Sequence, residues 1–440
     1  MRKVYSFQII EPSVFIERLL LFSKQYSRSC LLTSNEWEGS RVDMIAAMDA
    51  VDEIQPSSNT FETLKDFWTQ KKDWLFGHLS YDVKNEVEEL TSANNDELGF
   101  SVMHFFQPKY VFILKNSSVE VHYLSAHCSE DEIKNIAKEI MMDADSDMSN
   151  PAPVLITHPR ISKDEYLHAV SSIQKHIAYG DIYEMNYCME FFSERTEIEP
   201  ADLFLKLNRI SQAPFSAYYR LDEKYLLCAS PERFLKKSGS KILSQPIKGT
   251  ARRGKTPAED KQIKDQLLNN NKDRSENVMI VDLVRNDLSK TCEAVTVDEL
   301  FGVYSFKQWH QMISSVSGTI REGVHFIDVI KNAFPMGSMT GAPKVKAMEL
   351  IDRYEKTKRG MFSGAVGYLS PDGDFDLNVV IRSILYNKNV GYLSFMVGSA
   401  ITANSIPEHE YEECLLKAKG IFEALRPNAA QKKEMELLHH

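Results

Sequence analysis

The chain has 440 residues, of which 43% are hydrophobic and 26% charged, so it can bury one large core or two packed lobes. Its net charge of −10, and the absence of any apolar run near the roughly 18 residues of a membrane-spanning helix, argue against nucleic acid and membrane as partners. The six cysteines form no C-x-x-C pair and the N-terminus has no long apolar segment, which indicates a reduced, cytoplasmic protein.

The least patterned stretch of the chain, residues 141–159, separates two regions. It combines acidic residues, serine, asparagine and prolines, a composition that is typical of a linker or a long loop. We therefore predict an N-terminal region over residues 1–150, packed on the rest of the chain, and a core region over residues 160–428.

The core region alternates helical and strand-like patterns. Residues 162–181 are typical of a helix, because Ser162 can cap its start and Glu165 follows three residues later. Apolar and aromatic runs indicate strands over residues 214–221, 224–230, 241–247, 361–370, 375–387 and 391–402. The sequence Pro-Asp-Gly over residues 371–373 is typical of a hairpin turn. The expected fold is therefore α+β, with mainly antiparallel sheets and peripheral helices, rather than a doubly wound parallel sheet.

Two further helical patterns carry carboxylates on or beside their apolar stripes. They cover residues 271–288 and 407–425, and the carboxylates concerned are Asp273, Glu276, Glu410 and Glu413. Two ordinary amphipathic helices with solvated carboxylates are the alternative. Carboxylates that face the interior must be paired or bind a cation, and an all-oxygen set without His or Cys suits Mg²⁺.

A glycine-rich segment over residues 335–354 leads into another predicted helix. It includes Thr340 and Gly341, and free backbone N–H groups at such a helix start attract a carboxylate or a phosphate. The spacing does not match G-x-x-x-x-G-K-[ST], so a phosphate-binding P-loop is excluded. A plain glycine-rich turn is the alternative.

Polar side chains also stand at the ends of several predicted strands. Lys248 follows an apolar strand and precedes a glycine, so it needs either a partner or a chemical role. Arg382 lies inside an apolar run, where a guanidinium requires an anion. The remaining members of this set are Glu232, Tyr368, Gly398 and Ser399. Each of them alone is more often structural than functional.

Together these segments resemble the chorismate-utilising enzymes. That family includes component I of anthranilate synthase, component I of aminodeoxychorismate synthase, and the isochorismate and salicylate synthases. The matching motifs are GDIYEMN, PFSAYYRL, ASPERFL, PIKGTARRG, RSENVMIVDLVRNDL, FPMGSMTGAPKVKAMELI, SGAVGYL, IRS and EHEYEECLLKAKG, between about residue 162 and residue 425. The resemblance implies a two-lobed sandwich of mainly antiparallel sheets, like that of anthranilate synthase component I. It also implies a Mg²⁺-dependent site between the lobes, and chorismate as substrate, bound by the core region over residues 160–428.

The resemblance also implies a role for the lysine in PIKGT. This motif is usual in aminodeoxychorismate synthases, where the lysine is a proposed nucleophile, whereas anthranilate synthases usually have PIAGT. Lys248 is then the expected nucleophile. Glu232 is expected either to be protonated at some point in the cycle or to trade a proton with Lys248. Burial is expected to lower the pKa of Lys248 and so to favour its reactive, neutral form.

Metal and substrate residues follow from the same resemblance. Glu276 and Glu413 are expected to bind Mg²⁺ directly, and Asp273 and Glu410 to bind it through water. The expected substrate-binding residues are Gly249, Thr250, Thr340, Gly341, Tyr368, Arg382, Gly398, Ser399 and Lys417. Among them, Arg382 with Tyr368 is expected to meet the enolpyruvyl carboxylate of chorismate.

The implied reaction converts chorismate and ammonia to 4-amino-4-deoxychorismate, toward 4-aminobenzoate and folate. None of the six cysteines has the small-residue surroundings of a nucleophile turn. A separate glutamine amidotransferase subunit is therefore expected to supply the ammonia. The alternatives are an anthranilate synthase component I and a non-catalytic, chorismate-binding regulatory subunit.

The chain also departs from the family at three positions. The family's usual Gly-Ala-Gly or Gly-Gly-Gly turn reads Gly-Ser-Ala over residues 398–400. Glu184 stands where isochorismate and salicylate synthases carry a general-base lysine, so attack of water at C2 of chorismate is not expected. Gln311, beside His310, stands where the family often has histidine. A short match to the family's tryptophan pocket comprises Ser34, Pro214, Phe215 and Ser216, with ordinary strand ends as the alternative.

Overall fold

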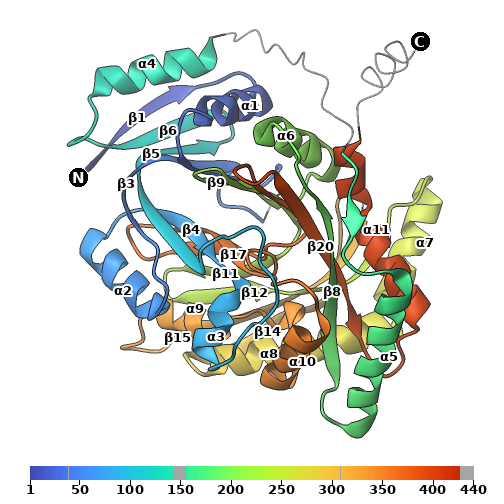
Figure 1. Cartoon of the computed structure of the whole chain (residues 1–440). Helices are drawn as coiled ribbons and strands as arrows, with labels where there is room; N and C mark the ends of the chain where they lie inside the picture. Colours follow the sequence, from blue (N-terminus) through green and yellow to red (C-terminus); the bar gives the residue numbers. More distant parts are fainter. Residues whose placement is uncertain (38, 143–154, 308, 427–440) are drawn as a thin grey trace, which may run out of the picture.

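The computed structural model describes residues 1–37, 39–142, 155–307 and 309–426 (Figure 1). Residues 143–154, the middle of the predicted linker, lie outside the described residues. The named strands of the described part form one connected sheet, and all their pairings are antiparallel. Helices lie around this sheet instead of alternating with parallel strands, which confirms the α+β class.

The sheet has two arms, and the first runs from β1 to β8. Its strands, in order of pairing, are β1 (Arg2–Gln8), β6 (Ser118–Leu124), β5 (Met103–Lys115), β3 (Met44–Ile54), β2 (Arg28–Thr33), β9 (Phe215–Leu221), β10 (Lys224–Ser230), β19 (Ser383–Asn387), β20 (Tyr392–Ile401) and β8 (Glu184–Ser193). The short strands β7 (His158–Pro159) and β16 (Gly341–Ala342) pair with β8. Because β2 pairs with β9, strands of the predicted N-terminal region and of the predicted core region share this arm.

The second arm branches from β5, whose first residues pair with β4 and whose last residues pair with β6. It continues through β4 (Leu75–Leu79), β17 (Ala365–Leu369), β18 (Phe375–Asn378), β11 (Arg233–Ser238), β12 (Lys241–Gln245) and β15 (Trp309–Ile320), with β13 (Ile247–Arg252) and β14 (Cys292–Ser305) beside β15. The predicted turn over residues 371–373 joins β17 to β18. Gly373 has a φ of 77° there, a conformation that glycine adopts without steric cost.

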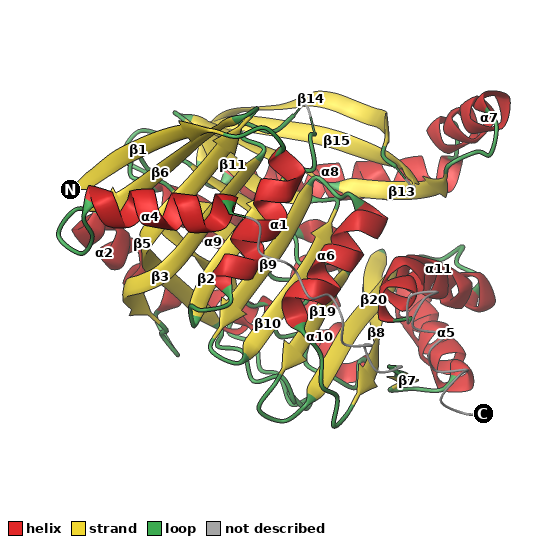
Figure 2. Ribbon diagram, turned by 90° about the horizontal axis from the view of Figure 1, so that it is seen from above, coloured by secondary structure: helices red, strands yellow, loops and turns green. Residues whose placement is uncertain are grey.

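Two hydrophobic cores hold the helices against the two arms. Figure 2 shows α1, α4 and α6 lying across strands of the first arm. The helices of the first core are α1 (Pro12–Ser23), α4 (Glu130–Met141), α5 (Lys163–Tyr179), α6 (Pro200–Ser211), α10 (Lys344–Tyr354) and α11 (Pro407–Leu425). Those of the second core are α2 (Thr60–Lys71), α8 (Asn271–Ser289) and α9 (Phe326–Ala333). Each fully buried Leu or Phe in these cores contributes about 1.5–3 kcal/mol.

The helix predicted over residues 162–181 is α5, and its start shows why the local sequence is helical. The Ser162 hydroxyl accepts a hydrogen bond from the backbone N–H of Glu165, and the Glu165 carboxylate accepts one from the backbone N–H of Ser162. This reciprocal cap satisfies two of the N–H groups that a helix start leaves free. No helix in the described ranges is long and apolar enough to cross a membrane.

Candidate active site

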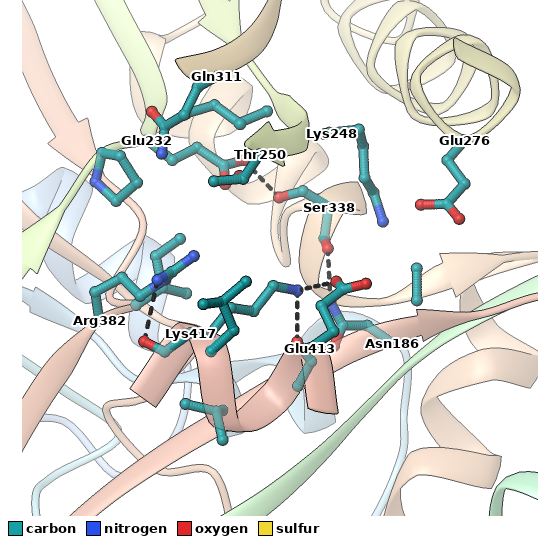
Figure 3. Close-up of a pocket in the computed structure, with 18 of the residues that line it drawn as sticks. Asn186, Glu232, Lys248, Thr250, Glu276, Gln311, Ser338, Arg382, Glu413 and Lys417 are labelled. Atoms are coloured by element: carbon teal, nitrogen blue, oxygen red, sulfur yellow. Dashed lines mark hydrogen bonds and ion pairs between the residues drawn. The ribbon is translucent and has the colours of Figure 1, made fainter. Parts of the chain in front are cut away.

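A cavity of about 430 Å³ lies where elements of the two arms meet. Strand β13, helix α8 and the connection from β10 to β11 supply part of its lining, and β8, β20 and α11 supply much of the rest. Figure 3 shows side chains from these elements converging on it. The residues predicted from sequence that line it are Glu232, Lys248, Gly249, Thr250, Asp273, Glu276, Arg382, Gly398, Glu413 and Lys417.

Lys248 extends from β13 and pairs with a carboxylate that was not its predicted partner. Its Nζ donates a hydrogen bond to Glu184 Oε1 at 2.7 Å, and the two side chains are 9% and 2% exposed. Burial by itself would lower the pKa of Lys248, but Glu184 and Glu276 outweigh it and raise the pKa. The expectation of a lowered pKa is therefore wrong for this arrangement, because carboxylates rather than apolar groups surround the ammonium.

Glu232 lies in the connection between β10 and β11 and is almost fully buried. Its Oε1 accepts a hydrogen bond from Ser338 Oγ at 2.6 Å. Burial raises the pKa of Glu232 to about 7, although Ser338 and Lys248 both favour its ionised form. This carboxyl group can therefore hold or release a proton near neutral pH, as a general acid requires.

A buried ion pair supports the wall that carries Ser338. Arg359 donates to both carboxylate oxygens of Glu355, at 2.6 and 2.9 Å, and to the backbone carbonyls of Met339 and Asn186, at 2.5 and 3.0 Å. The side-chain amide of Asn186 in turn donates to the Ser338 carbonyl at 3.0 Å. A fully paired, buried Arg–Glu contact of this kind positions the backbone around it.

Carboxylates from α8 and α11 line the same cavity. Glu276 Oε1 is buried and has no hydrogen-bond partner within the described ranges, and burial raises the pKa of Glu276 to about 7. Burial, reinforced by Glu413, also raises the pKa of Asp273. Glu413 pairs with Lys417 at 2.7 Å, which outweighs burial and lowers the pKa of Glu413. A buried, unpartnered carboxylate oxygen next to further carboxylates is an environment that a divalent cation neutralises.

Glu410 lies beside this acidic group but does not line the cavity. Lys272 Nζ donates to Glu410 Oε1 at 2.8 Å and lies 3.8 Å from Glu276 Oε1, so it lies between the two carboxylates. Within the described ranges, no three His, Cys, Asp or Glu side chains converge on one point as metal ligands. The carboxylates therefore fit Mg²⁺ only with water or substrate oxygens completing its shell, which Mg²⁺ commonly retains.

Arg382 and Lys417 make another part of the cavity cationic. Arg382 Nη1 donates to the Lys417 carbonyl at 3.0 Å, and Lys417 Nζ donates to the Gly398 carbonyl at 2.8 Å. Burial lowers the pKa of Arg382 to about 10, with Glu413 opposing the shift. The guanidinium has further N–H groups, which can bind a carboxylate.

Five predicted site residues do not line the cavity, and they are Thr340, Gly341, Tyr368, Ser399 and Glu410. The hydroxyl of Ser399 shares a hydrogen bond with Tyr166 at 3.0 Å, in the core. Gly341 pairs with β8, where a Cβ atom on it would lie 2.2 Å from the Glu184 carbonyl oxygen. Gly341 therefore permits the close strand pairing that positions Glu184.

Tyr368 belongs to a second cavity, of about 60 Å³, which lies elsewhere in the molecule. The same cavity is lined by the residues that resemble a tryptophan pocket, which are Ser34, Pro214, Phe215 and Ser216. Its volume is well below the roughly 150 Å³ of a cavity that holds benzene, so an indole requires its walls to move. The prediction that Tyr368 binds substrate in the main cavity is therefore wrong, because β17 places Tyr368 in this second cavity. Tryptophan binding stays a prediction.

Sequence reasoning missed the contact of Glu184 with Lys248, and it missed Asn186 and Ser338 in the lining of the main cavity. Glu184 and Asn186 stand in GDIYEMN and Ser338 in FPMGSMTG, and both motifs are matched segments. The available signal was an acidic residue at the start of an apolar strand, which must find a cation when it is buried. Nothing in the local pattern identified Lys248 as that cation.

Comparisons with known proteins bear on this cavity. The family model described as chorismate binding enzyme matches residues 23–423, which include every residue that lines the cavity. A probable aminodeoxychorismate synthase, chloroplastic, of Oryza sativa subsp. japonica is 44% identical over 264 residues, which are 59% of this chain and 29% of that protein. Anthranilate synthase component 1 of Thermus thermophilus is 31% identical over 362 residues, which are 80% of this chain and 77% of that protein.

The solved structures include a close match in fold. Anthranilate synthase component I from Streptococcus pneumoniae superposes with a TM-score of 0.77 at 24% sequence identity, covering 88% of this chain and 93% of that chain. The predicted fold, a two-lobed arrangement like that of anthranilate synthase component I, is thereby confirmed.

Proposed function

The chain belongs to the family of chorismate binding enzymes, and from that premise we propose that it converts chorismate and ammonia to 4-amino-4-deoxychorismate. This product leads toward 4-aminobenzoate and folate. The observation that carries the proposal is the buried amine of Lys248, which shares one cavity with Glu232 and with a cationic region suited to an anionic substrate. The similarity to the rice protein named aminodeoxychorismate synthase supports the same reading.

The proposal includes Mg²⁺ on the acidic side of the cavity. Glu276 and Glu413 would bind it directly, and Asp273 and Glu410 through water. Glu276 Oε1 and Glu410 Oε2 are buried and have no hydrogen-bond partner within the described ranges, although Lys272 lies near both carboxylates. Two such oxygens support this assignment, because a buried carboxylate oxygen needs a hydrogen bond or a cation. When bound, Mg²⁺ would supply positive charge beside the ring carboxylate of chorismate.

The two carboxylates of chorismate suggest how it is oriented. The ring carboxylate would lie toward Glu276 and the backbone of Gly249 and Thr250. The enolpyruvyl carboxylate would lie toward Arg382, with the Gly398 backbone beside it. Figure 3 shows Lys248 and Arg382 on opposite sides of the cavity, which leaves the ring between them.

Replacing Arg382 by lysine is expected to raise the KM for chorismate by about tenfold or more, because an ammonium cannot form two parallel hydrogen bonds with a carboxylate. Steady-state kinetics with varied chorismate would measure the change. Tyr368→Phe is the matched control, and its KM should not change because Tyr368 lies in the other cavity. An unchanged KM in the Arg382 variant would contradict the proposed orientation.

The proposed reaction proceeds in two substitutions. Lys248, as the free amine, adds to C2 of chorismate, the ring double bonds shift, and the bond from C4 to its hydroxyl breaks. Glu232 donates a proton, so the hydroxyl leaves as water. Ammonia then adds at C4, the double bonds shift back, and the bond from C2 to Lys248 breaks. Splitting one difficult substitution into two is the usual advantage of covalent catalysis.

Protons balance over this cycle. Lys248 must release one proton before it attacks, and it regains one when it leaves C2. Glu184 Oε1, at 2.7 Å, is in direct contact with the amine and can accept that proton. Glu232 recovers its own proton from solvent, and the amino group that forms at C4 keeps its three hydrogens as an ammonium.

Replacing Glu232 by glutamine is expected to change how stability depends on pH. The pKa of Glu232 in the folded protein is raised to about 7, so its protonated form stabilises the fold at low pH. This contribution to the free energy of unfolding is lost as pH rises from about 4.5 to about 7. The loss is on the order of 3 kcal/mol, and Glu232→Gln should not show it. Urea unfolding at pH 5 and pH 8 would measure both proteins. If the stability of the parent and of Glu232→Gln declined equally between pH 5 and pH 8, Glu232 would be ionised at both pH values in the folded protein.

We also propose that a separate amidotransferase subunit supplies the ammonia from glutamine. A glutaminase of the triad type needs a reactive, accessible cysteine thiolate. All six cysteines of this chain are free thiols and buried, which disfavours a glutaminase site here.

The test of the function is to assay the purified chain with chorismate and Mg²⁺, using ammonium chloride or glutamine as the nitrogen source. We expect 4-amino-4-deoxychorismate with ammonium and no product with glutamine. Formation of anthranilate would favour the second reading, which the similarity to the Thermus thermophilus protein supports. Chorismate binding without turnover would indicate a regulatory subunit, and product from glutamine alone would reject the separate partner.

A further inference from the structure

A third cavity, of about 40 Å³, adjoins the main cavity on the side of Arg382. The two cavities share Pro231, Trp309, Gln311, Arg382 and Lys417 as lining residues. The smaller one continues between the end of α6 and the second half of α11. Its volume accommodates only a molecule of about the size of water.

Gln311 presents an unsatisfied acceptor at the junction of the two cavities. Its side chain is almost fully buried, at 4% exposure, and Oε1 has no hydrogen-bond partner within the described ranges. Leaving such a buried acceptor unpaired is unfavourable, because burial removes its water without replacing the hydrogen bond. A small hydrogen-bond donor in one of the two cavities that it borders would therefore satisfy this oxygen.

The residues around Gln311 indicate whether that donor is neutral or charged. Much of the smaller cavity is apolar, with Leu207, Ala213 and Ile421 all buried in its wall, and apolar surroundings disfavour a charged guest. Arg382 also lines it, and a guanidinium repels another cation. A neutral donor thus fits this cavity, and an ammonium ion does not.

We propose that the small cavity between α6 and α11 holds ammonia, accepted by Gln311 Oε1, and delivers it to the substrate from the side of Arg382. This inference rests on the proposed function, which requires a nitrogen nucleophile at C4. In the proposed orientation, C4 lies near the enolpyruvyl group that Arg382 binds. Lys248 attacks C2 from the opposite side of the cavity, so the two nucleophiles do not compete for space (Figure 3).

Gly420 on α11 provides a test that leaves the main cavity untouched. It lines only the smaller cavity of the two, and a Cβ atom built on it would lie 3.8 Å from Ser211 Oγ, an ordinary contact. Gly420→Ala should therefore fold with an undiminished melting temperature, because alanine favours a helix more than glycine does. Gly420→Phe should fill the cavity.

The measurement is the KM for ammonia, obtained by varying ammonium chloride at fixed pH with saturating chorismate and Mg²⁺. Gly420→Phe is expected to raise this KM by about tenfold or more, while the KM for chorismate changes by less than about twofold. Lys419→Ala changes an exposed neighbour of Gly420 that lines neither cavity, so it should leave both KM values unchanged. Ser211→Leu fills the cavity from the facing helix and replaces Gly420→Phe if that variant does not fold.

The outcomes separate the two proposals. Product formation with an unchanged ammonia KM in the filled variants would overturn the ammonia site and leave the function standing. An equal rise in the KM for chorismate would also overturn it, because the substitution would then have distorted the main cavity. If the parent chain aminates no chorismate, the proposed function fails, and the ammonia site fails with it.

Discussion

Replacing Lys248 by alanine is expected to lower the formation of 4-amino-4-deoxychorismate by at least about 1,000-fold, because the variant has no amine to form the bond at C2. In the parent chain, rapid quenching and peptide mass spectrometry should locate a substrate adduct on Lys248. An adduct on another residue, or full activity in the alanine variant, would show that Lys248 is only structural. Formation of anthranilate by the parent would instead favour the second reading.

This experiment needs a control for stability. Lys248 and Glu184 form a buried pair, and removing one partner of such a pair typically costs about 3–5 kcal/mol. The double variant Lys248→Met/Glu184→Gln removes both charges together, so it should unfold at a higher temperature than Lys248→Ala. It should be equally inactive, which separates loss of the nucleophile from loss of the fold.

Replacing Glu413 by alanine is expected to abolish turnover while the fold stays intact. Glu413 is one of the two proposed direct ligands, and its side chain is 39% exposed with a single ion pair, to Lys417. Exposed ion pairs contribute about 0–1 kcal/mol, so the melting temperature should change little. Calorimetric titration with Mg²⁺ should show weaker binding, independently of activity.

The matched control is Glu408→Gln, which changes another carboxylate of the same helix, α11. Glu408 is exposed and does not line the cavity, so this variant loses the same charge without losing a proposed ligand. It should retain both turnover and Mg²⁺ affinity. Undiminished activity or unchanged Mg²⁺ affinity in Glu413→Ala would reject the assignment of Glu413 as a ligand.

Local sequence patterns predicted much of the fold. The Ser162–Glu165 cap and the turn over residues 371–373 are present, because each depends on residues close together in the chain. The single strand predicted over residues 375–387 is wrong, because β18 and β19 occupy this range as separate strands that pair with β11 and β10. Helical spacing likewise placed Glu276 on a buried face, with Ile280 one turn later. Such a pattern identifies the face of a helix, but not the groups that lie opposite it.

The predicted site residues that lie elsewhere show this limit. Tyr368 stands on β17, which pairs with β4 and β18, and those neighbours direct it to the other cavity. Glu410 lies one helical turn before a cavity residue, yet it does not line the cavity and instead accepts a hydrogen bond from Lys272. In both cases the position depends on a contact with a segment that is distant in sequence.

The sequence by itself determined the α+β class, the family, and the lysine, arginine and carboxylates from which the cavity is built, because motifs and periodicity are local properties. The tertiary structure is what pairs Lys248 with Glu184, 64 residues away. It also places Gln311 at two cavities, where its Oε1 has no hydrogen-bond partner in the part of the chain that the structure describes. The physical reason is that ionisation and pairing depend on every charge within a few ångströms and on the water that burial removes. Both depend on which distant segments the fold brings together.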